Sequence, residues 1–219
     1  HGCIDGFSRR VIWLKLERSN NDPVIIGNLF KNAIMEVEGC PTLLRTDRGT
    51  ENTIISSAQC FLRRNGTDSD AGLKAHRFGS SHSNQRIEAW WAFLRRSWSS
   101  WWINFFKDLI HEGKLDTSNK LHLECVWFCF NNLIQNELNR VMEEWNSHYV
   151  RKSRFQTVSG IPNNLYYLPQ SVNATDHKYL YNPEDLEEIN NDLHIYESAD
   201  SLLYQEYFSY VRQIIGFGE

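Results

Sequence analysis

The order of its first predicted elements constrains the fold of this chain more than any other feature. The stretches HGCID and RRVIWLKLE are rich in β-branched and aromatic residues, and turn-forming residues join them at Gly6 to Ser8. They are therefore predicted to form a β-hairpin. A helix and another strand are predicted to follow. Because a strand, helix, strand order favours a parallel crossover, we predict an α/β fold.

The helix after the hairpin is predicted from its start, its end and its apolar spacing. Pro23 stands in its first turn and Gly39 just beyond its end, as is typical of helices. The next stretch, PTLLRTD, is predicted to be a short buried strand, which places Asp47 at a strand's carboxyl end. Apolar side chains at the spacing of one helix face are Ile26, Leu29, Phe30, Ala33, Ile34 and Val37.

The remainder of the chain is predicted to be rich in helices. A helix is expected from Glu51 onward, and the stretch AHRF is expected to form a short fifth strand. Ser83 is predicted to cap a helix that starts at Asn84. A long helix is predicted from about Leu121 to Tyr149. The sheet-forming segments therefore lie near the beginning of the chain, and its second half is helical.

The net charge of −4 combines two segments of opposite sign. Residues 1–170 contain 21 Lys and Arg and 17 Asp and Glu, which gives +4, whereas residues 171–219 contain 2 and 10, which gives −8. We therefore predict one domain with a helical extension over residues 1–170 and an acidic C-terminal tail over residues 171–219. The tail is expected to bind a protein partner. Alternatively, it folds back over the basic face as a mimic of DNA charge.

The composition is typical of a globular protein without membrane helices. Hydrophobic residues make up 41% of the chain and aromatic residues 13%, which is enough for a packed interior. The stretch WSSWWINFF is interrupted by serines and Asn104 and is followed at once by Lys107. It is too short and too polar for a bilayer span, which requires roughly 18 or more apolar residues.

Five cysteines, an odd number, stand in apolar contexts. Their pattern favours reduced thiols in the nucleus or cytoplasm over a disulfide framework. Cys125 and Cys129 lie four residues apart on a predicted helix with His122 nearby, so a metal site is one interpretation. Because no second Cys/His pair has zinc-finger spacing, we prefer the interpretation that they are buried core thiols.

Two carboxylates stand where an α/β sheet gathers its ligands. Asp47 follows a strand, and Glu88 lies one turn inside the helix predicted after SSHSNQR. Ligands bind at the carboxyl ends of strands in open α/β sheets, so both residues could face one crevice. Carboxylates suit Mg²⁺ or Mn²⁺, and two such ions about 4 Å apart can stabilise phosphodiester cleavage. Alternatively, Asp47 forms an Asx-turn over Gly49 and Glu88 is a solvated helix charge.

Three stretches resemble, in the same order, the core of retroviral integrases and DDE transposases. LRTDRGTEN is similar to the second-aspartate motif of that core, and HSNQRIEAWWAFLRR resembles its glutamate helix. HGCIDGFSRRVIWL is similar to a pair of its strands. The stretches WWAFLRR, SSWWINFFKDL, RKSR and IPNNLYYLP most resemble animal integrase core domain-containing proteins. The resemblance covers residues 1–170.

The resemblance implies an RNase H-like fold, with a five-stranded mixed sheet flanked by helices. In that fold three strands precede the first helix, and the first of them carries a catalytic aspartate. Only two strands are predicted before the helix in this chain, so the first strand is expected upstream of His1. Asp5 is then expected to hydrogen-bond the backbone near Phe7 and Ser8 in the hairpin turn rather than to bind a metal.

The function that the resemblance implies is DNA integration or transposition by a metal-dependent polynucleotidyl transferase derived from a mobile element. Asp47 and Glu88 would be catalytic and would hold Mg²⁺ or Mn²⁺, while water or a DNA 3′-hydroxyl attacks the phosphodiester. The main alternative is a domesticated, catalytically inactive module of the same fold that binds nucleic acid or protein. An RNase H-like nuclease acting on RNA/DNA hybrids is a third candidate.

Basic residues are predicted to contact the DNA backbone. On the glutamate helix, Arg95 lies seven residues after Glu88 and is expected to share its face. Contacts to phosphate position a nucleic acid without reading its sequence. Solvated surface charge is the alternative for each residue alone. The predicted nucleic-acid-binding residues are Arg86, Arg95, Arg96, Arg151, Lys152 and Arg154.

The eight tryptophans include adjacent pairs at 90/91 and 101/102. We expect them to pack in a core or in a dimer interface, and the protein is therefore expected to form a homo-oligomer. Stacking on bases is the alternative.

Overall fold

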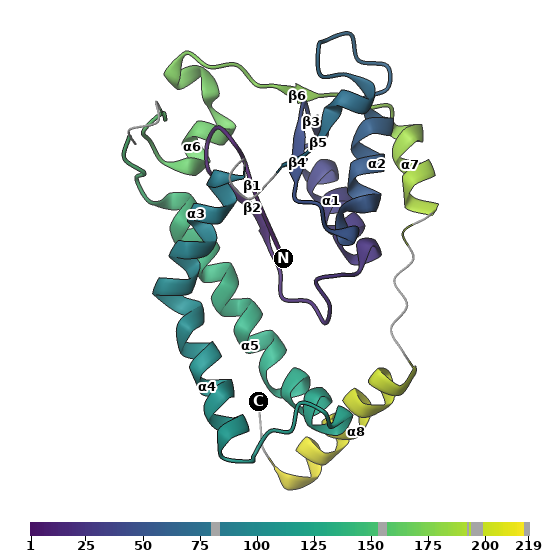
Figure 1. Ribbon diagram of the computed structural model, residues 1–219, viewed down its shortest axis with the longest axis vertical. Coiled ribbons are helices and arrows are strands. Elements are labelled where there is room, and N and C mark those ends of the chain that lie inside the picture. Colours follow the sequence, from purple (N-terminus) through teal and green to yellow (C-terminus); the bar gives the residue numbers. More distant parts are fainter. Residues whose placement is uncertain (80–83, 153–156, 192, 194–198, 217–219) are drawn as a thin grey trace. The chain divides into compact units, whose positions relative to one another are not determined.

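A computed structural model describes the chain (Figure 1). The chain divides into two compact units. Unit 1 combines His1–Glu88 with Leu138–Ile195, and unit 2 combines Ala89–Glu137 with Tyr196–Glu219. Residues beyond position 170 are thus shared between the two units. The structure describes residues 1–79, 84–152, 157–191, 193 and 199–216.

The described strands belong to unit 1 and form three two-stranded ladders rather than one continuous five-stranded sheet. The ladders are β1 (Gly2–Ile4) antiparallel to β2 (Val11–Leu14), β4 (Leu44–Thr46) parallel to β5 (His76–Phe78), and β3 (Cys40–Pro41) antiparallel to β6 (Lys178–Tyr179). The predicted hairpin and the predicted strand AHRF are confirmed. The parallel crossover runs from β4 to β5, and none of these ladders joins β2 to β4 around the helix that starts at Pro23.

Helices begin and end close to the predicted positions. The first of them starts at Pro23, where the Asp22 carboxylate accepts a hydrogen bond of 2.9 Å from the Val24 N–H and so caps the helix. The predicted cap Ser83 lies outside the described residues. The helices are α1 (Pro23–Glu36), α2 (Thr53–Leu62), α3 (Gln85–Leu94), α4 (Ser100–His111), α5 (Lys120–Ser147), α6 (Pro162–Tyr167), α7 (Pro183–Asn191) and α8 (Ala199–Ile215).

None of the helices in the described ranges has the length and apolar character needed to span a bilayer.

Short 3₁₀ turns connect several elements of unit 1. They are Thr50–Asn52, Gly72–Ala75 and Pro169–Val172.

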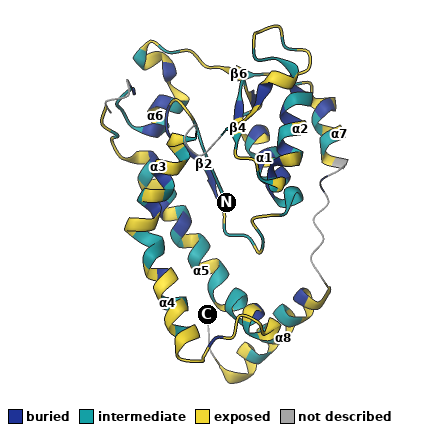
Figure 2. Cartoon of the chain, viewed as in Figure 1, coloured by how far each residue is buried: buried dark blue, intermediate teal, exposed yellow. Residues whose placement is uncertain are grey.

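The core of unit 1 lies where α1 and α2 pack together. The predicted apolar face of α1 supplies the buried residues Ile26, Phe30 and Ile34. Figure 2 colours the buried positions of the chain dark blue. Side chains from beyond residue 170 pack against this core, and the Arg64 guanidinium donates two hydrogen bonds, of 2.9 and 2.7 Å, to the Asp185 carboxylate. The segment with β6 and α7 is therefore part of unit 1. Its packed side chains are Tyr179, Tyr181, Leu186 and Ile189.

The end of α5 is fastened to β2 by a buried amide. The Asn146 side chain accepts a hydrogen bond of 2.8 Å from the Val11 N–H and donates one of 2.9 Å to the Val11 carbonyl. Both residues are at least 95% buried, with exposed fractions of 5% and 1%. Asn146 thus satisfies two backbone groups that would otherwise be buried without a partner.

Unit 2 is built around aromatic side chains of α4 and α5. The indole N–H groups of Trp98 and Trp102 donate hydrogen bonds of 2.6 and 3.0 Å to the same oxygen of Glu137. Trp102, which is buried, also packs against Phe130. The expectation of core packing is confirmed for Trp102, whereas Trp101 is 63% exposed.

Candidate metal and nucleic-acid site

Asp47 follows β4 directly, at the carboxyl end of the strand, as predicted. The adjacent backbone is fixed, because the Gly79 N–H donates a hydrogen bond of 2.8 Å to the Thr46 carbonyl just beyond β5. The Thr46 hydroxyl lies 3.0 Å from His76 Nε2. Burial lowers the pKa of His76, so its ring is neutral at neutral pH and adds no charge beside the strand end. The Asp47 side chain itself is exposed.

The Asp47 carboxylate accepts a hydrogen bond from a side chain rather than from the backbone of its own turn. Its Oδ1 accepts a hydrogen bond of 2.8 Å from Asn52 Nδ2, and the same nitrogen donates one of 2.8 Å to Glu51 Oε1. Within the described ranges, no hydrogen bond from the Gly49 N–H to Asp47 is present, so the alternative of an Asx-turn over Gly49 is wrong. Asp47 Oδ2 has no protein partner among those residues.

Glu88 lies in the first turn of α3 and is exposed. Its N–H donates a hydrogen bond of 3.2 Å to the Asn84 carbonyl, which starts the helix. A carboxylate in a first turn is stabilised by the positive end of the helix dipole. Glu88 and Asp47 both belong to unit 1, and neither carboxylate forms an ion pair with any residue that the structure describes.

The donor chemistry of these two residues fits a hard divalent cation. Asp47 and Glu88 present exposed carboxylates, and Mg²⁺ and Mn²⁺ prefer oxygen ligands. The described parts of the chain contain no group of three or more His, Cys, Asp or Glu side chains arranged to hold a metal. Hydrogen bonds there bring Asp47 together with Asn52 and Glu51. Sequence reasoning missed Asn52, although it stands in the same motif.

Asp5 forms the hairpin turn, as predicted. Its Oδ2 accepts hydrogen bonds from the Phe7 N–H at 3.1 Å, from the Ser8 N–H at 2.6 Å and from the Ser8 hydroxyl at 2.7 Å. Ser8 is fully buried. Asp5 therefore satisfies donors that would otherwise be left unpaired between β1 and β2.

Replacing Asp5 with alanine is expected to destabilise unit 1 by about 1–3 kcal/mol, because the buried Ser8 donors lose their acceptor. Urea unfolding followed by circular dichroism measures this loss. Mn²⁺ affinity is expected to stay unchanged in Asp5→Ala. A loss of Mn²⁺ affinity without a change in unfolding midpoint would instead assign Asp5 to the metal.

The predicted basic residues of the glutamate helix lie in two structural settings. Arg86 is exposed in the first turn of α3 and belongs to unit 1. Arg95 and Arg96 are exposed in a π-helical turn, Arg95–Ser99, that follows α3 in unit 2. The residues between Glu88 and Arg95 lie in α3, and the π-helical turn begins only at Arg95, so the shared face of these two residues stays a prediction.

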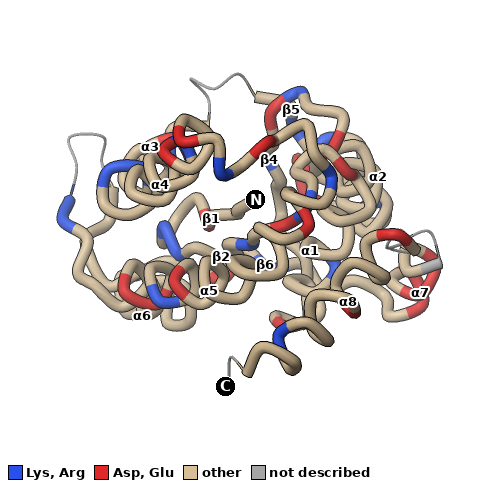
Figure 3. Tube along the Cα trace, turned by 90° about the horizontal axis from the view of Figure 1, so that it is seen from below, with Lys and Arg blue, Asp and Glu red and all other residues tan. Residues whose placement is uncertain are grey.

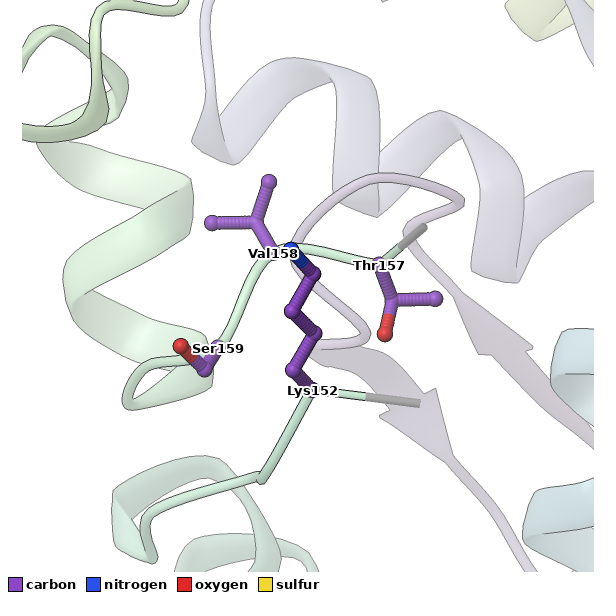
Figure 4. Close-up of a pocket in the computed structure, with 4 residues that line it drawn as sticks. All are labelled: Lys152, Thr157, Val158 and Ser159. Carbon is purple, nitrogen blue, oxygen red and sulfur yellow. The ribbon is translucent and has the colours of Figure 1, made fainter. Parts of the chain in front are cut away.

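Lys152 of the second basic segment lines a shallow pocket of unit 1. Arg151 and Lys152 are exposed, whereas Arg154 lies outside the described residues. Figure 4 shows the Lys152 side chain extended toward Val158 in an open depression of about 500 Å³ that Thr157 and Ser159 also line. Figure 3 shows the Lys and Arg positions of the described residues in blue. The polar lining and the exposed ammonium group suit contact with a phosphate.

Arg9 is a further residue that the sequence did not single out. It is 6% exposed and has a left-handed backbone with φ of 64°. Its guanidinium donates hydrogen bonds to the carbonyls of Arg151 and Val158, and so it holds the two ends of the segment that carries Lys152. Burial, and then the nearby charge of Arg86, lower the pKa of Arg9. In the sequence, the only signal for Arg9 was that it stands next to Arg10 at the hairpin turn.

Cys3 and Cys40 are not poised to act as nucleophiles. Burial raises the pKa of the Cys3 thiol to about 12 and that of the Cys40 thiol to about 11, so both are protonated at neutral pH. Cys40 is a buried core thiol. The prediction that Cys125 and Cys129 on α5 are buried core thiols is wrong, because Cys129 is exposed and Cys125 is only partly buried.

Comparison with known proteins identifies the family. A family model described as "Integrase core domain" matches residues 1–176. This match covers the strand pair, the Asp47 motif, α3 and α5. No curated protein and no solved structure matches the chain. The chain belongs to the integrase core domain family, whose members have an RNase H-like fold and polynucleotidyl transferase-type function.

Proposed function

We propose that this chain is the core of a polynucleotidyl transferase that cleaves and joins DNA with divalent metal ions and that derives from a mobile element. The observation that supports it best is the state of Asp47. This carboxylate is exposed at the carboxyl end of β4, with one oxygen bound to Asn52 and the other without a partner among the described residues. An acid held in this way is available to a cation.

Asp47 and Glu88 would hold the metal, which would act as a Lewis acid on the phosphodiester and activate the attacking oxygen. The first-turn residue Arg86 would neutralise a phosphate of the bound strand, because exposed guanidinium groups bind phosphate oxygens in pairs. The protein would contribute position and charge rather than a covalent intermediate. The protonated thiols of Cys3 and Cys40 agree with this division of roles.

A cleavage assay tests the proposal. The chain is incubated with an end-labelled DNA duplex and Mg²⁺ or Mn²⁺, and products are separated on a denaturing gel. Strand breaks and joined products that require the ion and disappear with a chelator are the expected result. Breaks that persist with the chelator would contradict metal-dependent chemistry.

A catalytically inactive nucleic-acid-binding module is the second candidate. The absence of a three-residue metal-ligating group from the described part of the chain favours it. Under this alternative the chain retains its affinity for DNA and yields no strand breaks with either ion. Measuring DNA affinity and cleavage on the same preparation distinguishes the two candidates.

Phosphate contacts by the predicted basic residues have a measurable signature. The slope of log affinity against log salt concentration is expected to fall by about 1 in magnitude for Arg86→Ala and again for Lys152→Ala. Lys114→Ala is the matched control, since the exposed Lys114 is paired with Glu112 at 2.6 Å. Fluorescence anisotropy over a salt series measures the slopes. Equal slopes for all three variants would make these residues solvated surface charge.

A further inference from the structure

Asn52 is buried beside the two carboxylates of the Asp47 motif. Its exposed fraction is 3%, and it is the last residue of the 3₁₀ turn that precedes α2. Its Nδ2 donates hydrogen bonds of 2.8 Å to Asp47 Oδ1 and of 2.8 Å to Glu51 Oε1. A single amide group therefore joins both acids.

The chemistry of these groups fixes the orientation of the amide. Ionised carboxylates only accept hydrogen bonds, so the Asn52 atom between Asp47 and Glu51 must be the donating nitrogen. An amide nitrogen carries two hydrogens, and these two bonds use both. Asp47 is thereby held with Oδ1 occupied, which leaves Oδ2 as the oxygen available to a cation.

The amide also holds two like charges near each other. Oδ1 of Asp47 and Oε1 of Glu51 are each 2.8 Å from the same nitrogen, so they lie within twice that distance of one another. Two carboxylates at such a separation repel. The Glu51 carboxylate occupies space beside Gly49, where a Cβ would lie 1.9 Å from Glu51 Oε1. A cation near Asp47 would reduce the repulsion between the Asp47 and Glu51 carboxylates, which Asn52 holds near each other.

We infer that Asn52 is a positioning residue of the metal site, which orients the Asp47 carboxylate and keeps the Glu51 charge beside it. This inference rests on the proposed function, because it requires a cation at Asp47. Groups that orient a ligating carboxylate by hydrogen bonding typically change metal affinity 10- to 100-fold when removed. The effect of Asn52 is expected in binding, before any DNA is present.

Mn²⁺ alone is the probe. Binding of Mn²⁺ to the whole chain is followed by the loss of the electron paramagnetic resonance signal of the free ion, and thermal unfolding is recorded for each variant. The matched control is Asn146→Ala, which removes another buried amide with two hydrogen bonds, here to Val11 rather than to an acid. Asp47→Asn shows whether the ion binds at the proposed site.

The expected result is a Mn²⁺ dissociation constant at least about tenfold higher in Asn52→Ala and unchanged in Asn146→Ala, although both variants unfold at lower temperature. If Asp47→Asn abolishes binding and Asn52→Ala binds like the unmodified chain, the role of Asn52 is overturned and the proposed function stands. If the unmodified chain binds no Mn²⁺, the metal site and this inference both fail. They also fail if Asp47→Asn binds Mn²⁺ with the same affinity as the unmodified chain.

Discussion

Asp47→Asn is expected to reduce metal-dependent DNA cleavage by at least about a thousandfold. A metal ion stabilises the charge that develops on a phosphodiester by several kcal/mol, and about 4 kcal/mol corresponds to a thousandfold change in rate. Glu88→Gln is expected to lower the rate by a similar factor, since an amide oxygen carries no charge for the ion. Single-turnover cleavage of an end-labelled duplex measures both effects.

The two substitutions are expected to leave folding and DNA affinity nearly unchanged, because both side chains are exposed. Glu184→Gln is the matched control, as Glu184 also lies exposed in the first turn of a helix, α7. It should cleave like the unmodified chain. Cleavage that survives both Asp47→Asn and Glu88→Gln would exclude these carboxylates as the metal ligands.

A chain that ends at residue 170 is expected to lose much of the stability of unit 1. It lacks β6 and α7, and with them four side chains that pack against the α1 and α2 core. In Figure 3 every charged position of α7 is acidic, yet the apolar residues Leu186 and Ile189 of this helix pack on the core. Full burial of a large apolar side chain contributes roughly 1.5–3 kcal/mol, and these four side chains are partly buried, so their joint loss is expected to reach about 4 kcal/mol.

Hydrogen exchange of the α1 amides measures this loss directly, because core helices open with the free energy of their unit. The control deletes only residues 199–219, which removes α8, an element of unit 2. That shorter deletion should leave the protection of α1 unchanged. Unchanged protection in the chain that ends at residue 170 would instead make the acidic segment a dispensable tail.

Local signals in the sequence predicted the elements well. Asp22 and Pro23 mark the start of α1, and alternating β-branched and aromatic residues mark the hairpin, because these features act within a few residues of chain. The role of Asp5 was predictable for the same reason, since an aspartate in a turn bonds to the backbone two and three residues ahead.

Features that depend on distant parts of the chain were not predictable. The charge of residues 171–219 indicated an acidic tail, but the apolar side chains of α7 pack on residues more than a hundred positions earlier. The π-helical turn that follows α3 leaves no pattern in the sequence and interrupts the α-helical spacing beyond Arg95. The proposed role of Asn52 was not predictable from the sequence, because it depends on the burial of this side chain and on its hydrogen bonds to two carboxylates.

The most direct test of the metal site is a crystal structure of the chain grown or soaked with Mn²⁺, with data collected at the manganese absorption edge. If Asp47 and Glu88 share one metal ion, an anomalous peak is expected within about 2.0–2.4 Å of Asp47 Oδ2 and of a Glu88 carboxylate oxygen. A peak that contacts neither residue, or carboxylates too far apart to share one ion, would contradict it.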